Sequence, residues 1–427
     1  MPYQLSRLGG TLVIGDINGD RNDDVFFGGA AGQSGQLYLG NDDGTLTKVE
    51  QQAWEQDLAQ EDVAALFFDA NGDGHLDLYV VSGGNEKPKR SFYYQDRLYI
   101  NDGRGEFVKA EQSHPNTMFS GGVVTAADYD NDGDLDLFIG GRHTPHNYPF
   151  IPKSVLLRND TQNGIVKFVD TREKTIESIG MVTDAVWIDI DVDSWLDLIL
   201  VGEWMPVTVL KNKNGNFQNI TEQLGLEKSS GWWSSIVSHD FDGDGDVDFI
   251  LGNSGINTQL MASEDEPMTY YVQDINKDGK FDPILSYYIQ GESYPLPSRD
   301  ELLGQVNSLR KEYTTYDTYA KATIKKILRA GNVSSSSILE INSLKSSYLE
   351  NTGKGKFELW PLPEMAQLSM INGFVFDDFT GDGSKNILAA GNFYPYKVSL
   401  GKSDASLGTL LNFKDKKMSI DENNAKL

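Results

Sequence analysis

Short apolar runs recur along the chain, and each of them follows an acidic loop. The sequence after Asp77 is Leu-Tyr-Val-Val, after Asp136 it is Leu-Phe-Ile-Gly, and after Asp248 it is Phe-Ile-Leu-Gly. Runs of this length, rich in β-branched and aromatic residues and soon followed by glycine, are typical of β-strands. The pattern therefore predicts an all-β fold in which short strands alternate with acidic loops.

The acidic loops share the pattern D-x-[D/N]-x-D-x-x-x-D and occur seven times, starting at residues 16, 69, 128, 189, 240, 274 and 378. The first four steps between them are 51 to 61 residues long. A hairpin pattern, apolar-apolar-Asn-x-Gly-x-Gly-x-Phe, lies between the loops, most clearly at 98–107 and more loosely around Asn41, Asn159, Asn212 and Asn351. Periods of this length indicate blades or solenoid units. With four strands in each unit and about seven units, the sequence predicts a β-propeller of about seven blades. The strand edges of a propeller are short and protected.

One segment after the sixth acidic loop departs from the repeat. Ser298 and Glu301 form a capping-box signature ahead of apolar residues at helical spacing, and a second amphipathic stretch covers 316–327. We therefore expect a small helical insertion over about 296–331. Such an insertion either recognises a partner, because loops on a rigid scaffold often do, or covers one opening of the propeller.

The acidic loops hold three or four carboxylates within nine residues, and these charges repel one another unless a cation lies between them. Calcium fits because it takes six to eight oxygen ligands in flexible geometry. Position 6 is glycine in most copies, which allows a sharp turn, but Arg21 and Ser194 occupy it in the first and fourth loops. Plain Asp/Asn/Gly turns between strands are the alternative. An EF-hand is disfavoured because apolar residues such as Val80 replace its glutamate at position 12.

The predicted calcium ligands are the side chains at positions 1, 3, 5 and 9 and the backbone carbonyl at position 7 of the first six loops. These residues are Asp16, Asn18, Asp20, Asn22, Asp24, Asp69, Asn71, Asp73, His75, Asp77, Asp128, Asp130, Asp132, Asp134, Asp136, Asp189, Asp191, Asp193, Trp195, Asp197, Asp240, Asp242, Asp244, Asp246, Asp248, Asp274, Asn276, Asp278, Lys280 and Asp282. The seventh loop, 378–386, keeps the spacing but lacks two carboxylates, and it is interpreted as a decayed copy. About five to seven calcium ions are the expected cofactors.

The composition is strongly acidic. The chain contains 37 Lys and Arg residues and 63 Asp and Glu residues, which gives a formal net charge of −26. Nucleic acid is therefore excluded as a partner, since its phosphates would be repelled. Much of the charge lies in the loops, so loss of calcium is expected to destabilise the fold. Cysteine is absent, which excludes disulfides and thiol redox chemistry.

The sequence also bears on location and organisation. No stretch is long and apolar enough to span a membrane, and the first residues, Met-Pro-Tyr-Gln-Leu-Ser-Arg, lack the apolar core of a signal peptide. Calcium loops of modest affinity fill best where free calcium is near millimolar. We therefore expect an extracytoplasmic protein, in the periplasm or at the cell surface, whose export signal and any membrane anchor lie outside this chain. The expected parts are one propeller domain over 1–413 and a polar, fraying tail over 414–427.

No catalytic residue is predicted, because the chain contains no nucleophile elbow, P-loop or zinc motif. His143 and His146 form the only close histidine pair, and the proline between them places the pair in a surface loop. Two functions stay open: a non-catalytic scaffold that binds a protein or carbohydrate on one propeller face, and a carbohydrate-active enzyme, a polysaccharide lyase or glycosidase. If the protein is such an enzyme, Lys277 and Lys280 of the sixth acidic loop are the candidate basic residues beside a calcium ion. The tryptophans that either stack on sugars or fill the core are Trp204, Trp232, Trp233 and Trp360.

The acidic loops and several softer motifs resemble a known family. The softer motifs lie at 15–20, 140–142, 154–157, 294–303 and 404–406. Over residues 9–411 the chain resembles the FG-GAP/VCBS repeat family, the calcium-loop propellers that include the integrin α-chain head. It looks closest to the cartilage acidic protein-like branch, found in large extracytoplasmic proteins of Gram-negative bacteria. The resemblance implies a calcium-binding propeller and favours the scaffold over the enzyme.

Overall fold

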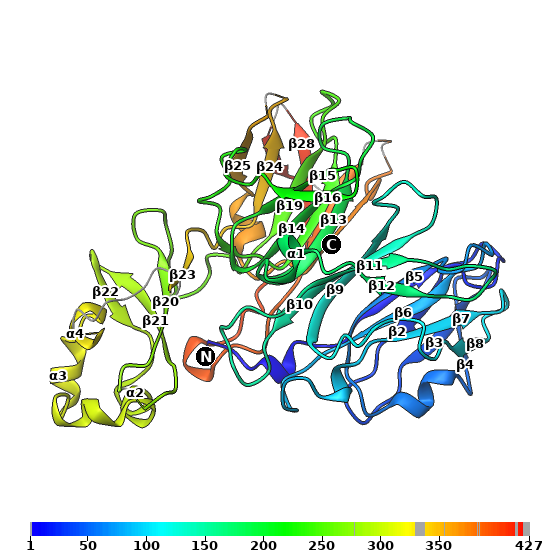
Figure 1. Cartoon of the computed structure of the whole chain (residues 1–427). Helices are drawn as coiled ribbons and strands as arrows, with labels where there is room; N and C mark the ends of the chain where they lie inside the picture. The colour runs from blue at the N-terminus through cyan, green and yellow to red at the C-terminus, as the bar shows by residue number, and fades with distance from the viewer. Residues whose placement is uncertain are drawn as a thin grey trace. The chain divides into compact units, whose positions relative to one another are not determined.

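A computed structural model describes residues 2–276, 278–328, 338–353, 355–381, 383, 385–414 and 417–421. Over these residues the strands form seven antiparallel sheets, six of four strands and one of five (Figure 1). The prediction of an all-β fold is confirmed. The repeated sheets are consistent with a propeller-like fold, while the number of blades stays a prediction.

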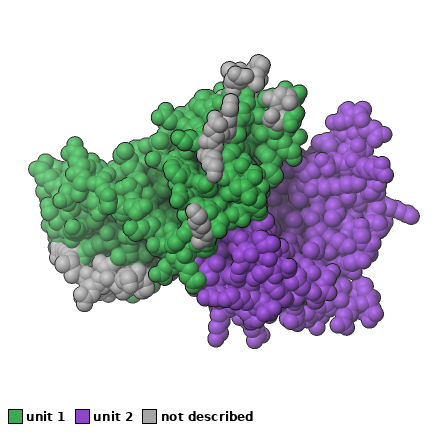
Figure 2. Space-filling view, turned by 90° about the horizontal axis from the view of Figure 1, so that it is seen from above, with its two compact units in different colours: residues 1–3, 202–207, 222–427 green, residues 4–201, 208–221 purple. Residues whose placement is uncertain are grey.

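The chain divides into two compact units, which Figure 2 shows in different colours. Unit 1 comprises Met1–Tyr3, Gly202–Val207 and Glu222–Leu427, and unit 2 comprises Gln4–Val201 and Thr208–Thr221. The single propeller domain expected over 1–413 stays a prediction.

Unit 2 is built from four meanders, in each of which an acidic loop joins the first strand to the second. The strands are β1 (Leu12–Gly15), β2 (Asp24–Phe27), β3 (Gln36–Gly40) and β4 (Leu46–Val49); β5 (Asp62–Phe68), β6 (Asp77–Ser82), β7 (Arg97–Asn101) and β8 (Phe107–Lys109); β9 (Ser120–Ala127), β10 (Asp136–His143), β11 (Val155–Asn159) and β12 (Phe168–Asp170); and β13 (Met181–Ile188), β14 (Asp197–Met205), β15 (Thr208–Lys213) and β16 (Asn216–Asn219). A short helix, α1 (Lys174–Glu177), precedes β13.

The sheets of unit 2 pack face to face in chain order. Leu78 and Val80 of β6 join a core cluster with residues of the first sheet, whereas Tyr79 and Val81 join a cluster with residues of the third sheet. Successive side chains of a strand point to opposite faces, so a strand between two sheets is apolar at every position. This explains why the runs after the acidic loops are continuously apolar rather than alternating. Each fully buried side chain contributes about 1.5–3 kcal/mol.

Unit 1 contains two further meanders and one sheet of a different order. Its strands are β17 (Gly231–Trp232), β18 (Ser235–His239), β19 (Asp248–Gly252), β20 (Met268–Gln273), β21 (Asp282–Ile289), β22 (Glu292–Pro295), β23 (Ile338–Ile341), β24 (Ser347–Asn351), β25 (Phe357–Pro361), β26 (Gly373–Asp377), β27 (Asn386–Ala390), β28 (Thr409–Lys414) and β29 (Lys417–Ile420). Strand β17 pairs with the end of β14 and is the fifth strand of that sheet.

Strands β20–β23 form a sheet that is here called the nested sheet. In the sequence, these strands fall between two adjacent strands of another sheet. Strand β19 pairs directly with β24, so the intervening residues 253–346 leave one meander between its second and third strands and return to it. The strand order of the nested sheet, β22-β21-β20-β23, also differs from the order of a meander. The insertion is therefore larger than the expected helices over 296–331, whose last three residues lie outside the described part of the chain. The nesting also explains the short step between the fifth and sixth acidic loops.

Three helices cover one face of the nested sheet: α2 (Arg299–Gln305), α3 (Tyr316–Ala320) and α4 (Ile324–Leu328) (Figure 1). The capping box of Ser298 and Glu301 at the start of α2 is present as predicted. Apolar residues of the helices, such as Leu302 and Ile327, form one buried cluster with Ile284 of β21. Arg299 supports this arrangement, because its Nε donates to the carbonyl oxygen of Tyr313 at 2.9 Å.

The end of the described chain is partly a strand. Strand β29 lies within the segment 414–427 that was expected to fray, and it pairs with β28. Residues 415, 416 and 422–427 of that segment lie outside the described residues. Among the helices of the described chain, none combines the length and the hydrophobicity that crossing a membrane requires.

Candidate metal centres in the acidic loops

The first aspartate of each loop organises the turn. Asp69 shows the arrangement: its Oδ1 accepts hydrogen bonds from the backbone N–H of Gly72 at 2.8 Å and of Asp73 at 3.2 Å, and its Oδ2 accepts one from Gly74 at 2.8 Å. Gly74 has a φ of +85°, as position 6 of the loop requires. Arg21 and Ser194 adopt the same left-handed region, with φ of 73° and 70°, at a cost of roughly 1–2 kcal/mol for a residue with a Cβ.

Positions 5 and 7 are joined in the same way in all six predicted loops. The side chain at position 5 accepts a hydrogen bond from the backbone N–H at position 7. This leaves the carbonyl oxygen of position 7 as the group that residue could offer to an ion. The residues at position 7 are Asn22, His75, Asp134, Trp195, Asp246 and Lys280.

The aspartate at position 9 is buried and holds two strands together, a role that the sequence pattern did not indicate. Oδ2 of Asp77 accepts from the backbone N–H of Ala70 at 3.0 Å, and Oδ1 accepts from that of Asn101 at 2.8 Å. Asp136 is bonded in the same way by Tyr129 and Asn159. Burial raises the pKa of Asp77 to about 7 and that of Asp136 to about 8, and the hydrogen bonds offset only part of this shift. A cation in the loop would favour the ionised form of both carboxyls.

Carboxylates at positions 1, 3 and 9 converge in three of the loops. Their oxygens lie within 4.8 Å of one another in the groups Asp128, Asp130, Asp136; Asp189, Asp191, Asp197; and Asp240, Asp242, Asp248. The loops at Asp16, Asp69 and Asp274 have asparagine at position 3, so an amide oxygen replaces one carboxylate there. All of these donors are oxygens, which suits calcium better than a softer metal. In the seventh loop, Asp382 lies outside the described residues.

A lysine reaches the fourth loop from the neighbouring strand. Nζ of Lys211 on β15 forms an ion pair with Asp191 and lies 3.3 Å from Oδ2 of Asp193. In the third sheet the equivalent residue, one place before the hairpin asparagine, is Arg158, whose Nε bonds to Asp160 at 2.7 Å instead. The fourth loop therefore already holds a positive charge among the side chains that would bind calcium.

Replacing Lys211 by glutamine is expected to raise the calcium affinity of the fourth loop at least tenfold. Two positive charges about 4 Å apart repel each other by roughly 1–4 kcal/mol near a protein surface, and each 1.4 kcal/mol is a factor of ten in affinity. Calorimetric calcium titration of Lys211→Gln should show one additional or one tighter site. Lys213→Gln, on the same strand but with its Nζ bonded to Gln218 at 3.3 Å, is the matched control and should leave the titration unchanged. An unchanged or weaker titration of Lys211→Gln would contradict the expectation.

The hairpin asparagines connect neighbouring sheets of unit 2. Nδ2 of Asn159 donates to the carbonyl oxygen of Ala70, in the loop of the preceding sheet, at 3.0 Å and to that of Leu135, in its own loop, at 3.2 Å. Asn101 and Asn212 make the equivalent pairs of bonds. The asparagines recur in the sequence pattern, but the carbonyl groups that they bond lie 16 to 89 positions away in the chain. These amides link each acidic loop to the next.

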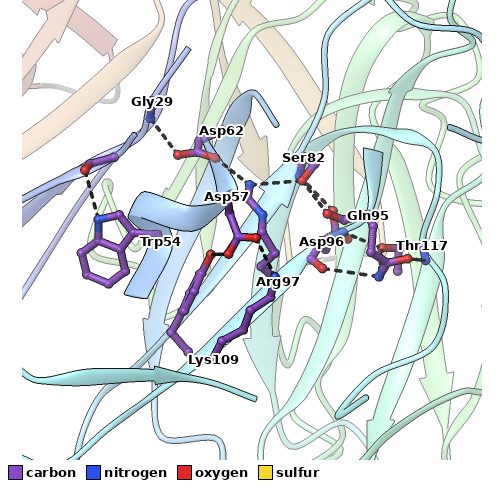
Figure 3. Close-up of polar contacts among 12 residues, drawn as sticks. Gly29, Trp54, Asp57, Asp62, Ser82, Gln95, Asp96, Arg97, Lys109 and Thr117 are labelled. Carbon is purple, nitrogen blue, oxygen red and sulfur yellow. Dashed lines mark hydrogen bonds and ion pairs between the residues drawn. The ribbon is translucent and has the colours of Figure 1, made fainter. Parts of the chain in front are cut away.

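A buried ion pair lies at the opposite end of the second sheet from its acidic loop (Figure 3). Nη2 of Arg97 lies 2.6 Å from Oδ1 of Asp62, and the two side chains are 3% and 5% exposed. Asp62 also accepts a hydrogen bond from the backbone N–H of Gly29 at 2.7 Å, and Arg97 donates to Oγ of Ser82 at 3.1 Å. The members of this network come from different strands and share no local motif, so the sequence pattern does not predict it.

Asp96 is buried and extends the same network. Its Oδ1 accepts from the backbone N–H of Ser82 at 2.9 Å, and its Oδ2 accepts from the hydroxyl of Tyr79 at 3.2 Å. Burial raises the pKa of Asp96 to about 7, although these hydrogen bonds and the nearby charge of Arg97 lower it. This carboxyl is therefore a structural acceptor within the sheet.

The tryptophans, histidines and lysines singled out in the sequence differ in how far their side chains are exposed. Trp204, Trp232 and Trp233 are buried core residues, whereas Trp360 on β25 is 50% exposed. The surface-loop prediction is wrong for His143, which is buried in strand β10, whereas His146 is exposed in the loop that follows. Lys280 is exposed, and Lys277 lies outside the described residues.

Three stretches of the chain, residues 16–80, 69–139 and 159–251, match the FG-GAP-like repeat and together cover just over half of it. No curated protein matches the chain.

Solved structures show weak similarity. The V. cholerae biofilm matrix protein Bap1 is 12% identical, with a TM-score of 0.35 over 98% of this chain and 80% of that chain. Sqt1 of Saccharomyces cerevisiae is 9% identical, with a TM-score of 0.37 over 92% of this chain and 97% of that chain. BBS1N, in its complex with ARL6DN, is 9% identical, with a TM-score of 0.31 over 91% of this chain and 89% of that chain. Similarity at this level assigns no function.

Proposed function

Because the chain belongs to the FG-GAP-like repeat family, we propose that it is a non-catalytic, calcium-stabilised propeller scaffold that recognises a protein or a glycan outside the cytoplasm. The single observation that carries the calcium part is the convergence of carboxylates at positions 1, 3 and 9 of three loops within 4.8 Å. Side chains of like charge at this spacing repel one another strongly unless a cation compensates them.

The acidic loops support a structural use of the ion. Position 9 of each of the first four loops accepts backbone hydrogen bonds from its own loop and from the neighbouring strand. An ion that binds positions 1, 3 and 9 would therefore stiffen the strand pairing and not only the loop. Rigid sheets with free loops suit recognition, and millimolar calcium outside the cytoplasm would keep sites of modest affinity filled.

Calorimetric titration of chelator-stripped protein with calcium tests this proposal. About five to seven bound ions are expected, and Asp130→Asn and Asp242→Asn should each remove or weaken one site, because each changes position 3 of a convergent group. Asp265→Asn, at an exposed carboxylate outside the loops, is the matched control. Binding of one ion or none would mean that the loops are turns held by hydrogen bonds, and the scaffold would have to be independent of calcium.

A further inference from the structure

A groove of about 580 Å³ lies beside the nested sheet in unit 1. Its lining comes from two segments: the end of strand β21 with the following turn, and the loop before strand β20. This volume is within the range of about 300–1,000 Å³ that is usual for small-molecule sites. The acidic loops and the buried ion pair contribute none of its lining residues.

The floor of the groove is the end of strand β21, whose lining side chains come from both faces of the nested sheet. Ile284 faces the helical cluster, and side chains alternate along a strand, so Tyr287 and Ile289 of β21 point to the other face. Both line the groove, and Ile289 is 45% exposed. Tyr294 of β22 is the cross-strand partner of Tyr287 and shares that face. Tyr288, on the face that the helices cover, also lines the groove, so two partly exposed aromatic side chains contribute to its floor.

The opposite wall is a loop held in place by one hydrogen bond within the loop and one to Ser399. Nε2 of Gln259 donates to the carbonyl oxygen of Ser399 at 2.8 Å, and the backbone N–H of Glu266 donates to Oγ of Ser263 at 3.0 Å. Met261 on this loop lines the groove and is 72% exposed. The amide, hydroxyl and carboxylate side chains of the wall thus stand opposite the aromatic floor in a preformed arrangement.

The turn at the rim of the groove carries a residue that its backbone disfavours. Gln290 and Gly291 join β21 to β22 with φ of 52° and 80°. A two-residue hairpin turn with both φ values positive favours asparagine or glycine, and a longer side chain there costs roughly 1–2 kcal/mol. The Gln290 side chain lines the groove. A strained residue at the mouth of a cavity is consistent with a role for its side chain rather than for the turn.

From this lining we infer that the groove binds an uncharged oligosaccharide. The ring of Tyr287 offers an apolar face for a sugar ring, and Gln259, Gln290 and Glu266 offer amide and carboxylate groups that match sugar hydroxyls as donors and acceptors. No Lys, Arg or His is among the described residues that line it, so an anionic sugar would find no counter-charge there in a protein of net charge −26.

The size of the groove favours a sugar chain over a protein. Nine residues line it, whereas a stable protein interface takes about 20–30 residues on each side. The inference rests on the proposed recognition scaffold and specifies one of its two ligand classes. Beyond that proposal, the inference locates the binding site and specifies that the glycan is uncharged.

Isothermal titration of the full chain in calcium-containing buffer tests the groove. The probes are cellohexaose, laminarihexaose, maltohexaose and chitohexaose as uncharged chains, with hexagalacturonate and hexalysine as the charged comparisons. At least one uncharged hexasaccharide is expected to bind, and Tyr287→Ala should weaken that binding at least tenfold. Gln290→Gly should weaken it severalfold while the melting temperature stays the same or rises, because glycine relieves the strain of the turn. Trp360→Ala, which removes an exposed aromatic side chain on β25, should leave binding unchanged.

Three results would overturn the inference: no binding of any uncharged hexasaccharide, binding of hexagalacturonate or hexalysine alone, or full binding by both Tyr287→Ala and Gln290→Gly. Calcium titration of the same samples separates this failure from a failure of the scaffold proposal. Normal calcium binding without sugar binding overturns the groove alone. Loss of both overturns the calcium scaffold as well.

Discussion

Removal of calcium with a chelator is expected to lower the melting temperature of this protein by 20 °C or more. A ligand that binds only the folded state at 100 times its dissociation constant contributes about 2.7 kcal/mol per site, so about five sites contribute roughly 13 kcal/mol. A change of 1 kcal/mol shifts the melting temperature of a domain of 150–250 residues by about 2–4 °C. The physical cause is the repulsion among converging carboxylates such as Asp240, Asp242 and Asp248, which the ion compensates.

Sodium chloride provides the control for this experiment, because it screens charge repulsion but does not occupy a calcium site. At about 0.5 M sodium chloride the repulsion between exposed charges is largely screened, whereas coordination by oxygens inside a loop is not replaced. Calcium should therefore restore the melting temperature of the stripped protein in high salt, and sodium chloride alone should restore only a small part. A melting temperature that is indifferent to the chelator, or that sodium chloride restores fully, would contradict the calcium scaffold.

Arg97→Met is expected to reduce the free energy of unfolding by about 3–5 kcal/mol, because it leaves the buried carboxylate of Asp62 without its partner. The distance of 2.6 Å between Nη2 and Oδ1 and the near-complete burial of both side chains place this pair in a low-dielectric environment. Methionine keeps much of the length of the arginine side chain, so loss of charge rather than loss of packing dominates. Urea denaturation of both proteins measures the difference.

A double variant separates the charge from the contact. In Arg97→Met with Asp62→Asn, the asparagine can still accept from the backbone N–H of Gly29, and no buried charge is left unpaired. Most of the lost stability should return, so the two single effects should not add. Arg158→Met is the control for an exposed pair, since its side chain is 45% exposed, and it should cost about 0–1 kcal/mol. Additive effects would show that Arg97 acts through packing instead.

The acidic loops show how far local sequence predicts structure here. The turn of Asp69, Gly72 and Gly74, and the bond from position 7 to position 5, involve atoms within nine residues of one another. The capping box of Ser298 and Glu301 is equally local, and it was predicted and found. The apolar runs after the loops predicted strands because a residue buried between two sheets must be apolar whichever way it points.

Other features depend on residues that only the fold brings together. Lys211 enters the fourth loop from β15, and its place before Asn212 does not distinguish it from Arg158, which bonds elsewhere. Position 9 of each loop was predicted as a metal ligand, but its burial, and in the first four loops its bond to a neighbouring strand, follow from the sheet. The groove at Tyr287 joins two segments of the nested sheet region whose lining shares no motif.

By itself, the sequence determined that the protein is built from repeated β-sheets with oxygen-rich loops, because strand patterning and loop turns depend on interactions between near neighbours in the chain. Only the tertiary structure decided that β19 pairs with β24, so that a whole sheet and its helices are nested between them. Strand pairing over such a separation is selected by the burial of complete sheet faces, and that burial is a property of the packed chain rather than of any local segment.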